Sequence, residues 1–438
     1  MIIQFAFSNY KTFKDKVVLS LVASNYDKDT NEEENVINIE KRGLRLLKSS
    51  VIFGANASGK SKLIDAIAFF RKFILESSKE SHEGEKIKIQ PFLLNPNSRN
   101  NTSEFEMTFI IKNVIYRYGF EVNRNVISAE WLYSRPVKKE LELFYRTEQS
   151  FEFDHKRLSK AEPIIKENLV RNNSLLLSVL AQFNDNTAIE ILNYFRNLNC
   201  VSGLDEREYK SSSIDKVRDD KNKRHQIIEF IKSADLGIQD LRFEDLYDKL
   251  DEKSKAAIKD IKNQMNEIDP HALSMIRTKH IVYDDQNKPD GFIEFFMSNE
   301  ESHGTQKYFY FAGLILDALE KGMVLFVDEL DSRLHPNLVS KIISLFNSKI
   351  TNKNNAQLIF NTHDTNLLSS GIFRRDQIWF ISKNDYGASK LYSLADFKTD
   401  TVRKNEPFEE NYIRGKYGAT PFLNEFENMT EQILKGNG

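Results

Sequence analysis

The chain has 438 residues, enough to bury a large core and to form more than one structural unit. Its 62 Lys and Arg residues nearly balance 64 Asp and Glu residues, and the formal net charge of −2 excludes a general attraction to nucleic acid, so such binding would need a local basic patch. The single cysteine, Cys200, excludes an intramolecular disulfide and a zinc site built from cysteines, as expected for a reducing compartment.

The amino-terminal residues predict strands rather than a targeting segment. Apolar and polar residues alternate at 1–9, and 17–22 is a second strand-like segment. We interpret the acidic, polar stretch at 27–39 as a loop. No basic segment precedes an apolar block, and no apolar run reaches transmembrane length, so we expect a cytoplasmic protein with no membrane partner.

The segment GANASGKS at 54–61 is a complete GxxxxGKS phosphate loop. An apolar run at 50–53 predicts a buried strand before it, and apolar residues at helical spacing over 62–75 predict a helix after it. The strand, loop and helix together indicate a nucleotide site. The alternative is a glycine-rich turn that matches the pattern by chance.

The chemistry of this loop predicts how it would hold a nucleotide. Glycine lets successive backbone N–H groups point at the β- and γ-phosphates, and the helix start adds partial positive charge. We expect Lys60 to place a catalytic point charge on the same phosphates and Ser61 to offer its hydroxyl to Mg²⁺. The candidate nucleotide-binding residues are Gly54, Asn56, Ser58, Gly59, Lys60 and Ser61.

Alternating residues after the first helix predict an antiparallel lobe beside a parallel nucleotide-binding sheet. The strand-like segments are 104–111, 114–122, 127–133 and 140–145. We assign them, with the phosphate loop, to a first unit at 1–157.

Helical patterns dominate from residue 158 onward. Apolar helices are predicted at 173–181 and 189–198, and charges of both signs after residue 202 indicate helices with a solvated face. We therefore expect a mainly helical inserted lobe at 158–275. Strands at 279–283 and 291–296 are expected to return the chain to the nucleotide-binding core, within a third segment at 276–438, which gives an α/β fold overall.

Two acids end the apolar strand predicted at 323–329. We expect Asp328 to hold the Mg²⁺ shell, and Glu329 to orient and deprotonate the water that attacks the γ-phosphate. The alternative is that both acids cap the following helix. A further strand at 356–361 is followed by His363, which would sense the γ-phosphate through a hydrogen bond; a histidine that is only packed or solvated is the alternative.

A serine and a glycine precede the apolar helix predicted at 308–319. Because a helix start binds anions, Ser302 and Gly304 in the segment ESHGTQ are candidate ligands of a phosphate.

The ordered set of these motifs resembles the ATP-binding-cassette type ATPases related to Rad50, the structural-maintenance proteins and RecF. The resemblance rests on the phosphate loop, the Ser-Gly segment, the strand ending in Asp-Glu and the Thr-His-Asp step at 362–364. It implies a head domain in which ATP is sandwiched between two copies, with Ser302 and Gly304 contacting the γ-phosphate bound at the other copy's Lys60. Glu301 and His303 depart from the family's LSGGQ, in which leucine and glycine stand at these places.

A narrower resemblance covers nearly the whole chain. The pairing of GANASGKS with ESHGT, the segment LFVDELDSRLHP, the NTHD step and the ending NYIRGKYGATP are similar to the AAA15/AAA21 group, which includes abortive-infection ATPases of the AbiL and RloA type and resembles the ATPase of PARIS-type phage defence. Members of the overcoming-lysogenization-defect type carry a Toprim nuclease. We expect none here, so the resemblance implies that the effector is a separate protein.

Two further features leave alternatives open. Gln90 stands where the family places a glutamine that reaches Mg²⁺ or the attacking water. Because Pro91 follows it, a glutamine that only belongs to a turn is an equally supported interpretation. The cluster of Arg414, Lys416 and Tyr417 would bind a phosphate, a partner or the other copy, or be a solvated tail.

The sequence therefore supports two hypotheses from different classes. The first is an ATPase switch, a homodimer that binds ATP and Mg²⁺ and controls a separate effector in prokaryotic antiviral defence. The second is a DNA-binding maintenance protein like RecF, for which the basic residues at 210–224 would have to form a groove although acids are interleaved there. We see no acid cluster outside the nucleotide site that would make the chain a nuclease.

Overall fold

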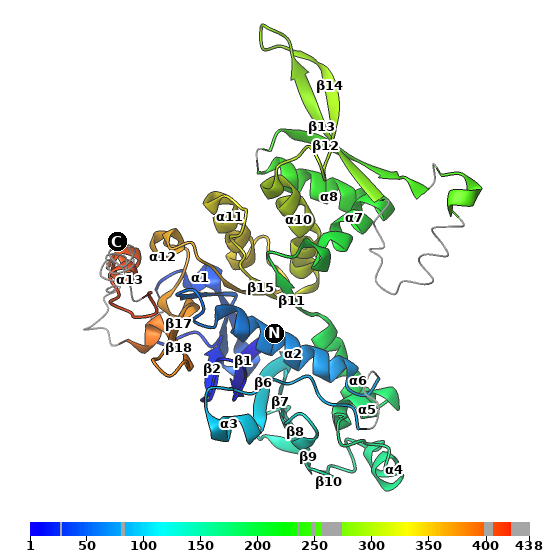
Figure 1. The fold of residues 1–438 in the computed structure, drawn as a ribbon, viewed down its shortest axis with the longest axis vertical. Coiled ribbons are helices and arrows are strands. Elements are labelled where there is room, and N and C mark those ends of the chain that lie inside the picture. Colours follow the sequence, from blue (N-terminus) through cyan, green and yellow to red (C-terminus); the bar gives the residue numbers. More distant parts are fainter. Residues whose placement is uncertain are drawn as a thin grey trace, which may run out of the picture.

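The computed structural model describes residues 1–26, 29–79, 84–234, 236–247, 250–255, 274–397 and 406–421. In this part of the chain two large sheets share one helix, and a small three-stranded sheet projects from the body (Figure 1). No helix among these residues is both long enough and apolar enough to cross a membrane.

A six-stranded sheet forms the centre of the fold. Its order is β11-β15-β16-β5-β17-β18, and all pairs are parallel except β17 with β18. The strands are β5 (Ser49–Gly54), β11 (Leu198–Ser202), β15 (Val324–Asp328), β16 (Gln357–Asn361), β17 (Ile378–Lys383) and β18 (Ser389–Ser393). Every residue of β5 and β16 is buried, as expected for parallel strands covered on both faces.

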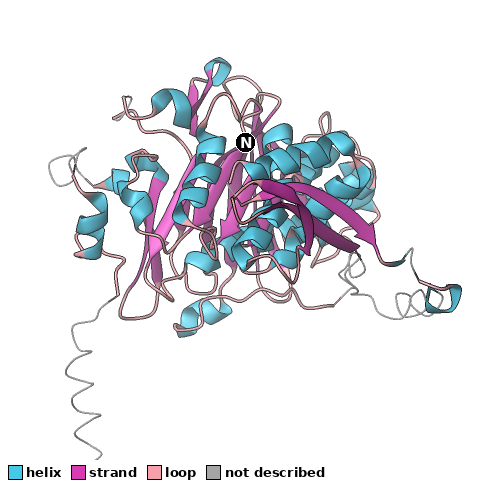
Figure 2. Ribbon diagram, turned by 90° about the horizontal axis from the view of Figure 1, so that it is seen from above, coloured by secondary structure: helices cyan, strands magenta, loops and turns pink. Residues whose placement is uncertain are grey.

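Helices cover both faces of this sheet, and Figure 2 shows them packed around the central strands. The apolar side of α2 (Lys60–Glu76) packs against one face, in a core that contains Ile52 and Ile359. The helices α10 (His303–Lys321) and α11 (Pro336–Asn347) pack against the other, in a core that contains Val51 and Leu358. Alternate residues of one strand thus enter two separate cores.

The seven-stranded antiparallel sheet confirms the predicted lobe. Its order is β10-β9-β8-β7-β6-β1-β2. Phe70 of α2 packs against Phe5 and Phe120 of this sheet, with ring centroids 5.4 and 5.3 Å apart, so the helix that follows the phosphate loop is held between the two large sheets. The strands are β1 (Ile2–Ser8), β2 (Val17–Ser20), β6 (Ser103–Ile111), β7 (Val114–Val122), β8 (Ile127–Arg135), β9 (Leu141–Thr147) and β10 (Ser150–Phe153).

The segment at 158–275, expected to be mainly helical, contains helices at both predicted apolar segments, but it also supplies strands to two sheets. Strand β11 pairs with β15 in the central sheet, and β12 (Ile238–Asp245) pairs with β13 (Ser274–Tyr283). Residues 235, 248, 249 and 256–273 of the predicted lobe lie outside the described residues. The helices are α4 (Ala161–Lys166), α5 (Leu176–Gln182), α6 (Asn186–Arg196), α7 (Lys210–Asp219) and α8 (Lys221–Lys232), with the short η2 (Glu206–Glu208).

The prediction that strands at 279–283 and 291–296 return to the nucleotide-binding core is wrong. They belong to β13 and β14 (Pro289–Phe296), which pair with each other and with β12 in the projecting sheet (Figure 1). Most of β14 is exposed on both faces. Local patterns identify a strand but not the sheet that it joins, because pairing is decided by tertiary contacts.

The stretch at 27–39, predicted as a loop, contains α1 (Glu32–Asn35) and β3 (Val36–Ile39), which pairs with β4 (Leu44–Leu47); residues 27 and 28 lie outside the described residues. The remaining elements are η1 (Glu40–Arg42), α3 (Pro96–Asn100), α12 (Asn366–Ser369), η4 (Arg375–Gln377), η5 (Leu394–Asp396) and α13 (Phe408–Ile413).

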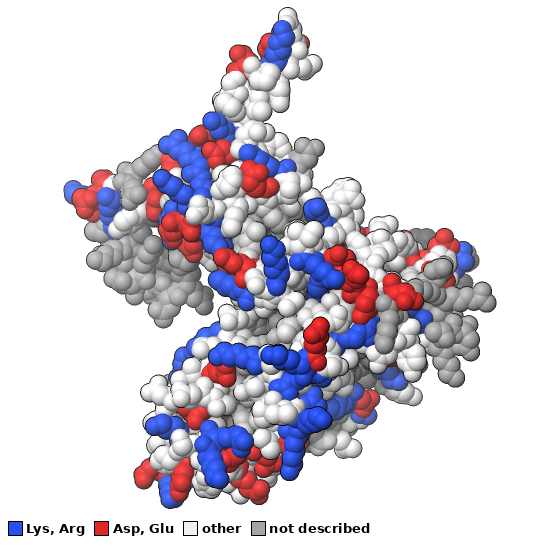
Figure 3. All heavy atoms as spheres, turned by 180° about the vertical axis from the view of Figure 1, so that it is seen from behind, with Lys and Arg blue, Asp and Glu red and all other residues white. Residues whose placement is uncertain are grey.

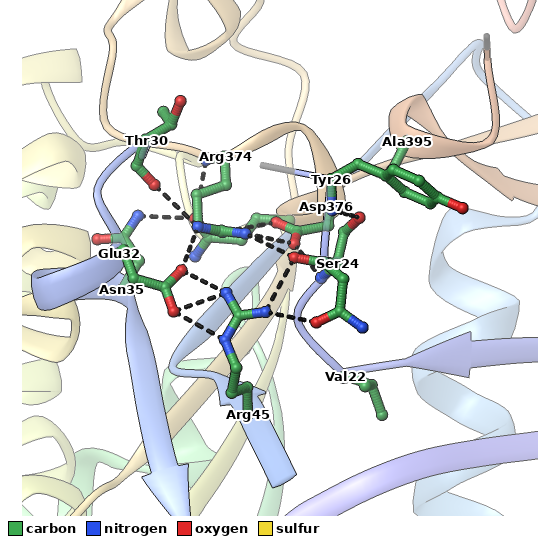
Figure 4. A network of polar contacts seen from close by, with 12 residues as sticks. Val22, Ser24, Tyr26, Thr30, Glu32, Asn35, Arg45, Arg374, Asp376 and Ala395 are labelled. Carbon is green, nitrogen blue, oxygen red and sulfur yellow. Dashed lines mark hydrogen bonds and ion pairs between the residues drawn. The ribbon is translucent and has the colours of Figure 1, made fainter. Parts of the chain in front are cut away.

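A polar network joins this stretch to the start of β17 (Figure 4). The fully buried guanidinium of Arg374 donates to Glu32 Oε2 at 2.7 Å and to Asp376 Oδ2 at 2.9 Å. Arg45 donates to both carboxylate oxygens of Glu32 at 2.6 Å, and Ser24 N donates to Asp376 at 2.6 Å. These charge-assisted bonds fix the chain that leads into the central sheet.

Candidate nucleotide site

Three neighbouring parallel strands bring the predicted motifs together. Strand β16 lies between β15 and β5, and parallel strands end at the same edge of a sheet. The phosphate loop follows β5, Asp328 and Glu329 lie at the end of β15, and His363 comes two residues after β16. This is the edge at which open α/β sheets bind ligands.

Neighbouring atoms leave no room for side chains at two glycines of the phosphate loop. Gly59 has φ 118°, in the region that favours glycine, and a Cβ there would lie 2.7 Å from Ser389 Oγ and 2.8 Å from Thr12 Oγ1. A Cβ at Gly54 would lie 2.5 Å from the carbonyl oxygen of Ile381. The loop therefore needs glycine at both positions to keep this conformation.

Lys60 is almost completely buried and bends back over this loop. Its Nζ donates to the carbonyl oxygens of Gly54 at 2.7 Å and Ala55 at 3.2 Å. Burial lowers the pKa of Lys60, and the negative charges of Glu329 and Asp328 act in the opposite direction. The lysine of one motif thus lies within the field of the acids of another.

The other loop residues differ in exposure. Asn56 is exposed and Ser61 is half-buried at the helix start. Ser58 is buried, and its Oγ has no hydrogen-bond partner among the described residues. This buried hydroxyl lies beside glycines that cannot carry side chains. A polar ligand such as a phosphate would supply the hydrogen bond that it lacks within the described residues.

The acid pair is positioned by Asn361, a residue that the sequence analysis did not single out. Asn361 is completely buried; its Nδ2 donates to Asp328 Oδ1, and its Oδ1 accepts from Glu329 N at 2.7 Å. Glu329 has φ 56°, a left-handed conformation that is strained for glutamate. One side chain therefore holds both the carboxylate of Asp328 and the backbone turn of Glu329.

Gly203, just beyond β11, supports the same turn from the other side. Its N–H donates to the carbonyl oxygen of Asp328 at 2.6 Å, and a Cβ at this position would lie 2.1 Å from the carbonyl oxygen of Glu329. The only sequence signal for this role is a glycine after an apolar strand. Its partner lies more than a hundred residues away, so spacing cannot reveal it.

His363 lies at the exposed side of the acid pair. Its Nε2 is 3.9 Å from Glu329 Oε1, and its backbone N–H donates to Asp331 Oδ2 at 3.2 Å. The imidazole is 44% exposed, so it is not a packed core histidine. It is free to reach a phosphate placed between the loop and the acids.

Ser302 caps helix α10, which begins at His303 rather than at the predicted residue 308, and its Oγ accepts from Thr305 N at 3.1 Å. Ser302 is exposed and Gly304 is half-buried. A Cβ at Gly304 would lie 2.7 Å from the carbonyl oxygen of Arg333, so this glycine also has a packing role within the subunit.

Gln90 is exposed, and the structure does not bring it into contact with the acids. Its carbonyl oxygen accepts from Lys11 N at 2.9 Å. Gln90 borders a cavity of about 370 Å³ that Thr12 and Lys62 also line, next to the phosphate loop. A role at the metal stays a prediction.

The predicted tail cluster divides into packed and exposed residues. Tyr417 is 2% exposed, stacks on Phe380 with ring centroids 5.6 Å apart, and accepts from Tyr392 Oη through its carbonyl at 2.8 Å. Lys416 pairs with Glu406 at 2.8 Å. Arg414 is exposed. Tyr417 thus belongs to the core and is not a solvated residue.

The residues of the site fit a magnesium-bound nucleoside triphosphate. The loop glycines and the Ser58 hydroxyl, which has no hydrogen-bond partner within the described part of the chain, suit the phosphates, and Lys60 supplies positive charge. Ser61 and Asp328 offer the oxygen ligands that Mg²⁺ prefers.

The chain is similar to a protein family and to solved structures. The family model described as "AAA domain, putative AbiEii toxin, Type IV TA system" matches residues 49–369, from β5 to α12. Among the similar solved structures is an SMC head domain from Thermotoga maritima, which is 12% identical with a TM-score of 0.40 over 90% of this chain and 98% of that one. Another is CbiO1 of Clostridium perfringens, part of the ABC transporter complex CbiONQ, which is also 12% identical, with a TM-score of 0.28 over 88% of this chain and 95% of that one. A search of the curated proteins returned no match. Because the matched residues span most of the sequence, the chain belongs to this AAA domain family.

Proposed function

We propose that this chain is an ATP-hydrolysing molecular switch that controls a separate effector protein in prokaryotic antiviral defence. The observation that carries the proposal is the buried Lys60 in the field of Glu329 and Asp328, after the two parallel strands β5 and β15 that flank β16. Transfer of a phosphoryl group to water needs a positive charge on the phosphates, a ligand for the metal and a group that orients the water. The lysine and the two acids can supply these three functions.

Each residue has a distinct task in this proposal. Lys60 neutralises the β- and γ-phosphates, and Ser61 and Asp328 hold Mg²⁺, which would polarise the γ-phosphate when bound. Glu329 orients the attacking water and accepts its proton. His363, 3.9 Å from the Glu329 carboxylate, donates a hydrogen bond to the γ-phosphate.

The switch requires two copies of the chain. Ser302 is exposed at the start of α10 and can therefore meet a nucleotide held by a second copy. ATP would close the dimer and hydrolysis would open it, and a differential affinity of about 3–5 kcal/mol between open and closed states suffices to reverse their populations.

The role in defence rests on the family. Its description names the AbiEii toxin and a type IV toxin–antitoxin system, and those names carry over to this chain only as part of the proposal. The effector would be a nuclease or toxin on another polypeptide.

Measuring the oligomeric state by light scattering, with and without MgATP, tests the switch. Glu329→Gln should bind ATP and accumulate as a dimer, because the carboxylate that accepts the proton is gone while the ligands remain. Lys60→Ala should neither bind ATP nor dimerise. A monomeric Glu329→Gln protein at saturating ATP would contradict ATP-driven closure.

DNA binding in the manner of RecF is the second candidate, and the described charges give it less support. Lys216 pairs with Asp317, Lys223 with Glu320, and Arg224 with Asp240 at 3.1 Å. Acidic and basic side chains are intermingled over the upper part of the face in Figure 3. Duplex binding that appears only with ATP and falls steeply with salt would favour this candidate over the first.

A further inference from the structure

A buried lysine on helix α10 contacts the turn that carries Glu329. Lys307 is completely buried, and its Nζ donates to the carbonyl oxygens of Ser332 at 2.6 Å, Leu330 at 3.1 Å and Glu329 at 3.4 Å. An ammonium group has three N–H donors, and here they meet three acceptors from one short turn.

This turn needs external support. Two of its residues, Glu329 with φ 56° and Arg333 with φ 59°, are left-handed, which costs roughly 1–2 kcal/mol each for a residue other than glycine or asparagine. Three carbonyl oxygens of this turn accept from the Lys307 ammonium, and hydrogen bonds from a charged donor are stronger than those from a neutral one.

A second contact joins the same two elements. Gly304, one turn before Lys307 on α10, approaches the carbonyl oxygen of Arg333 so closely that a Cβ would lie 2.7 Å from it. The first turns of α10 therefore contact the turn at 329–333 at two places, Gly304 and Lys307.

We propose that Lys307 is a positioning residue that makes the Ser302 end of α10 and the Glu329 turn move as one body. This inference rests on the proposed function, in which Ser302 faces the nucleotide of the second copy and Glu329 acts on the nucleotide of its own. Engagement of Ser302 across the dimer is then transmitted through Lys307 to Glu329, so that water attack in one site depends on occupancy of the other.

Lys48 provides a matched control. It is 2% exposed, and its Nζ donates to the carbonyl oxygen of Asn347 at 2.7 Å. Lys48 lies just before β5, at the opposite end of this strand from the phosphate loop. Burial lowers the pKa of Lys48 and of Lys307 to about 8 in both cases. Replacing either lysine by methionine removes a buried ammonium and keeps most of the side-chain volume.

The experiment measures kcat for ATP and the Kd of a fluorescent ATP analogue for Lys307→Met and Lys48→Met, with urea unfolding to confirm that both are folded. We expect Lys307→Met to lose more than about tenfold in kcat, since small misplacements of a reacting group have effects of this size, while its Kd stays within about threefold of wild type. Lys48→Met should keep the wild-type kcat. Lys307→Arg, which retains the charge and the donors, should recover part of the lost rate.

Equal kcat values for Lys307→Met and Lys48→Met would overturn the inference. If Lys307→Met is not folded, Lys307→Gln takes its place with the same expectation, because its amide donates to at most two of the three carbonyls. A wild-type protein that hydrolyses no ATP would refute the proposed function instead, so the two failures are distinguishable.

Discussion

Replacement of Asn361 by alanine separates the positioning of the acid pair from the folding of the sheet. Asn361 donates to Asp328 and accepts from the backbone N–H of Glu329 at 2.7 Å. Alanine removes both bonds and leaves the strand intact. The carboxylate of Asp328 is then free to rotate. The backbone N–H of Glu329, at the start of the left-handed turn, loses its hydrogen-bond acceptor.

The expected magnitude follows from these two bonds. A hydrogen bond to a charged group contributes about 1.5–3 kcal/mol, and an N–H left without a partner costs about 1–3 kcal/mol. If the bond to Asp328 acts mainly on the geometry of the acids, its loss corresponds to roughly 10- to 100-fold in kcat, because about 1.4 kcal/mol is tenfold in rate. The Kd for ATP should change little, since Lys60 is untouched.

Asn352, in the segment that precedes the same strand, is the control. It is 2% exposed, donates to the carbonyl oxygens of Phe346 and Ala356 at 2.6 and 2.8 Å, and accepts from Ala356 N at 2.7 Å. Asn352→Ala should lower the free energy of unfolding by a similar amount and leave kcat unchanged. Phosphate release at saturating MgATP and urea unfolding measure the two quantities. A wild-type kcat for Asn361→Ala, or an equal loss in both variants, would refute the reasoning.

Three further predictions concern stability and the site. Burial lowers the pKa of Lys48 from 10.5 to about 8, so between these pH values the unfolded chain binds one more proton than the folded protein. The free energy of unfolding of wild type relative to Lys48→Met should therefore rise by on the order of 3 kcal/mol as pH increases through this window. A fall in this difference would contradict the prediction. Arg374→Met leaves the buried carboxylate of Asp376 without its arginine partner, while Glu32 keeps its ion pair with Arg45, and should lower the free energy of unfolding in urea by about 3–5 kcal/mol. A loss below about 1 kcal/mol would count against the network in Figure 4. Gly203→Ala forces a methyl group to within 2.1 Å of a carbonyl oxygen in the acid turn and should reduce kcat more than about tenfold in a folded protein, and an unchanged kcat would show that the turn tolerates the shift.

Local patterns were sufficient for the elements that surround the nucleotide site. The apolar runs at β5, β15 and β16 are short and continuous because these strands are buried on both faces, and helical spacing identified α2 and α10. Motif spacing placed Lys60 and the acid pair at the ends of these strands. Their convergence on one edge could be expected because parallel strands share their direction.

The rest depended on contacts between distant residues. Strand β11 pairs with β15 across more than a hundred residues, and β14 lacks the alternation of a half-buried strand because most of it is exposed. Asn361 and Lys307 look like ordinary polar residues in apolar segments. Their importance arises from the carboxylate and carbonyl groups that the fold brings to them.

The central claim is that Glu329 removes the proton from the water that attacks ATP bound at Lys60. Steady-state release of phosphate from saturating MgATP, compared between wild type and Glu329→Gln at equal nucleotide occupancy, tests it most directly. The account predicts measurable turnover by wild type and a loss of at least about 100-fold in the variant, in the range typical of removing a general base. Equal rates for the two proteins would contradict it.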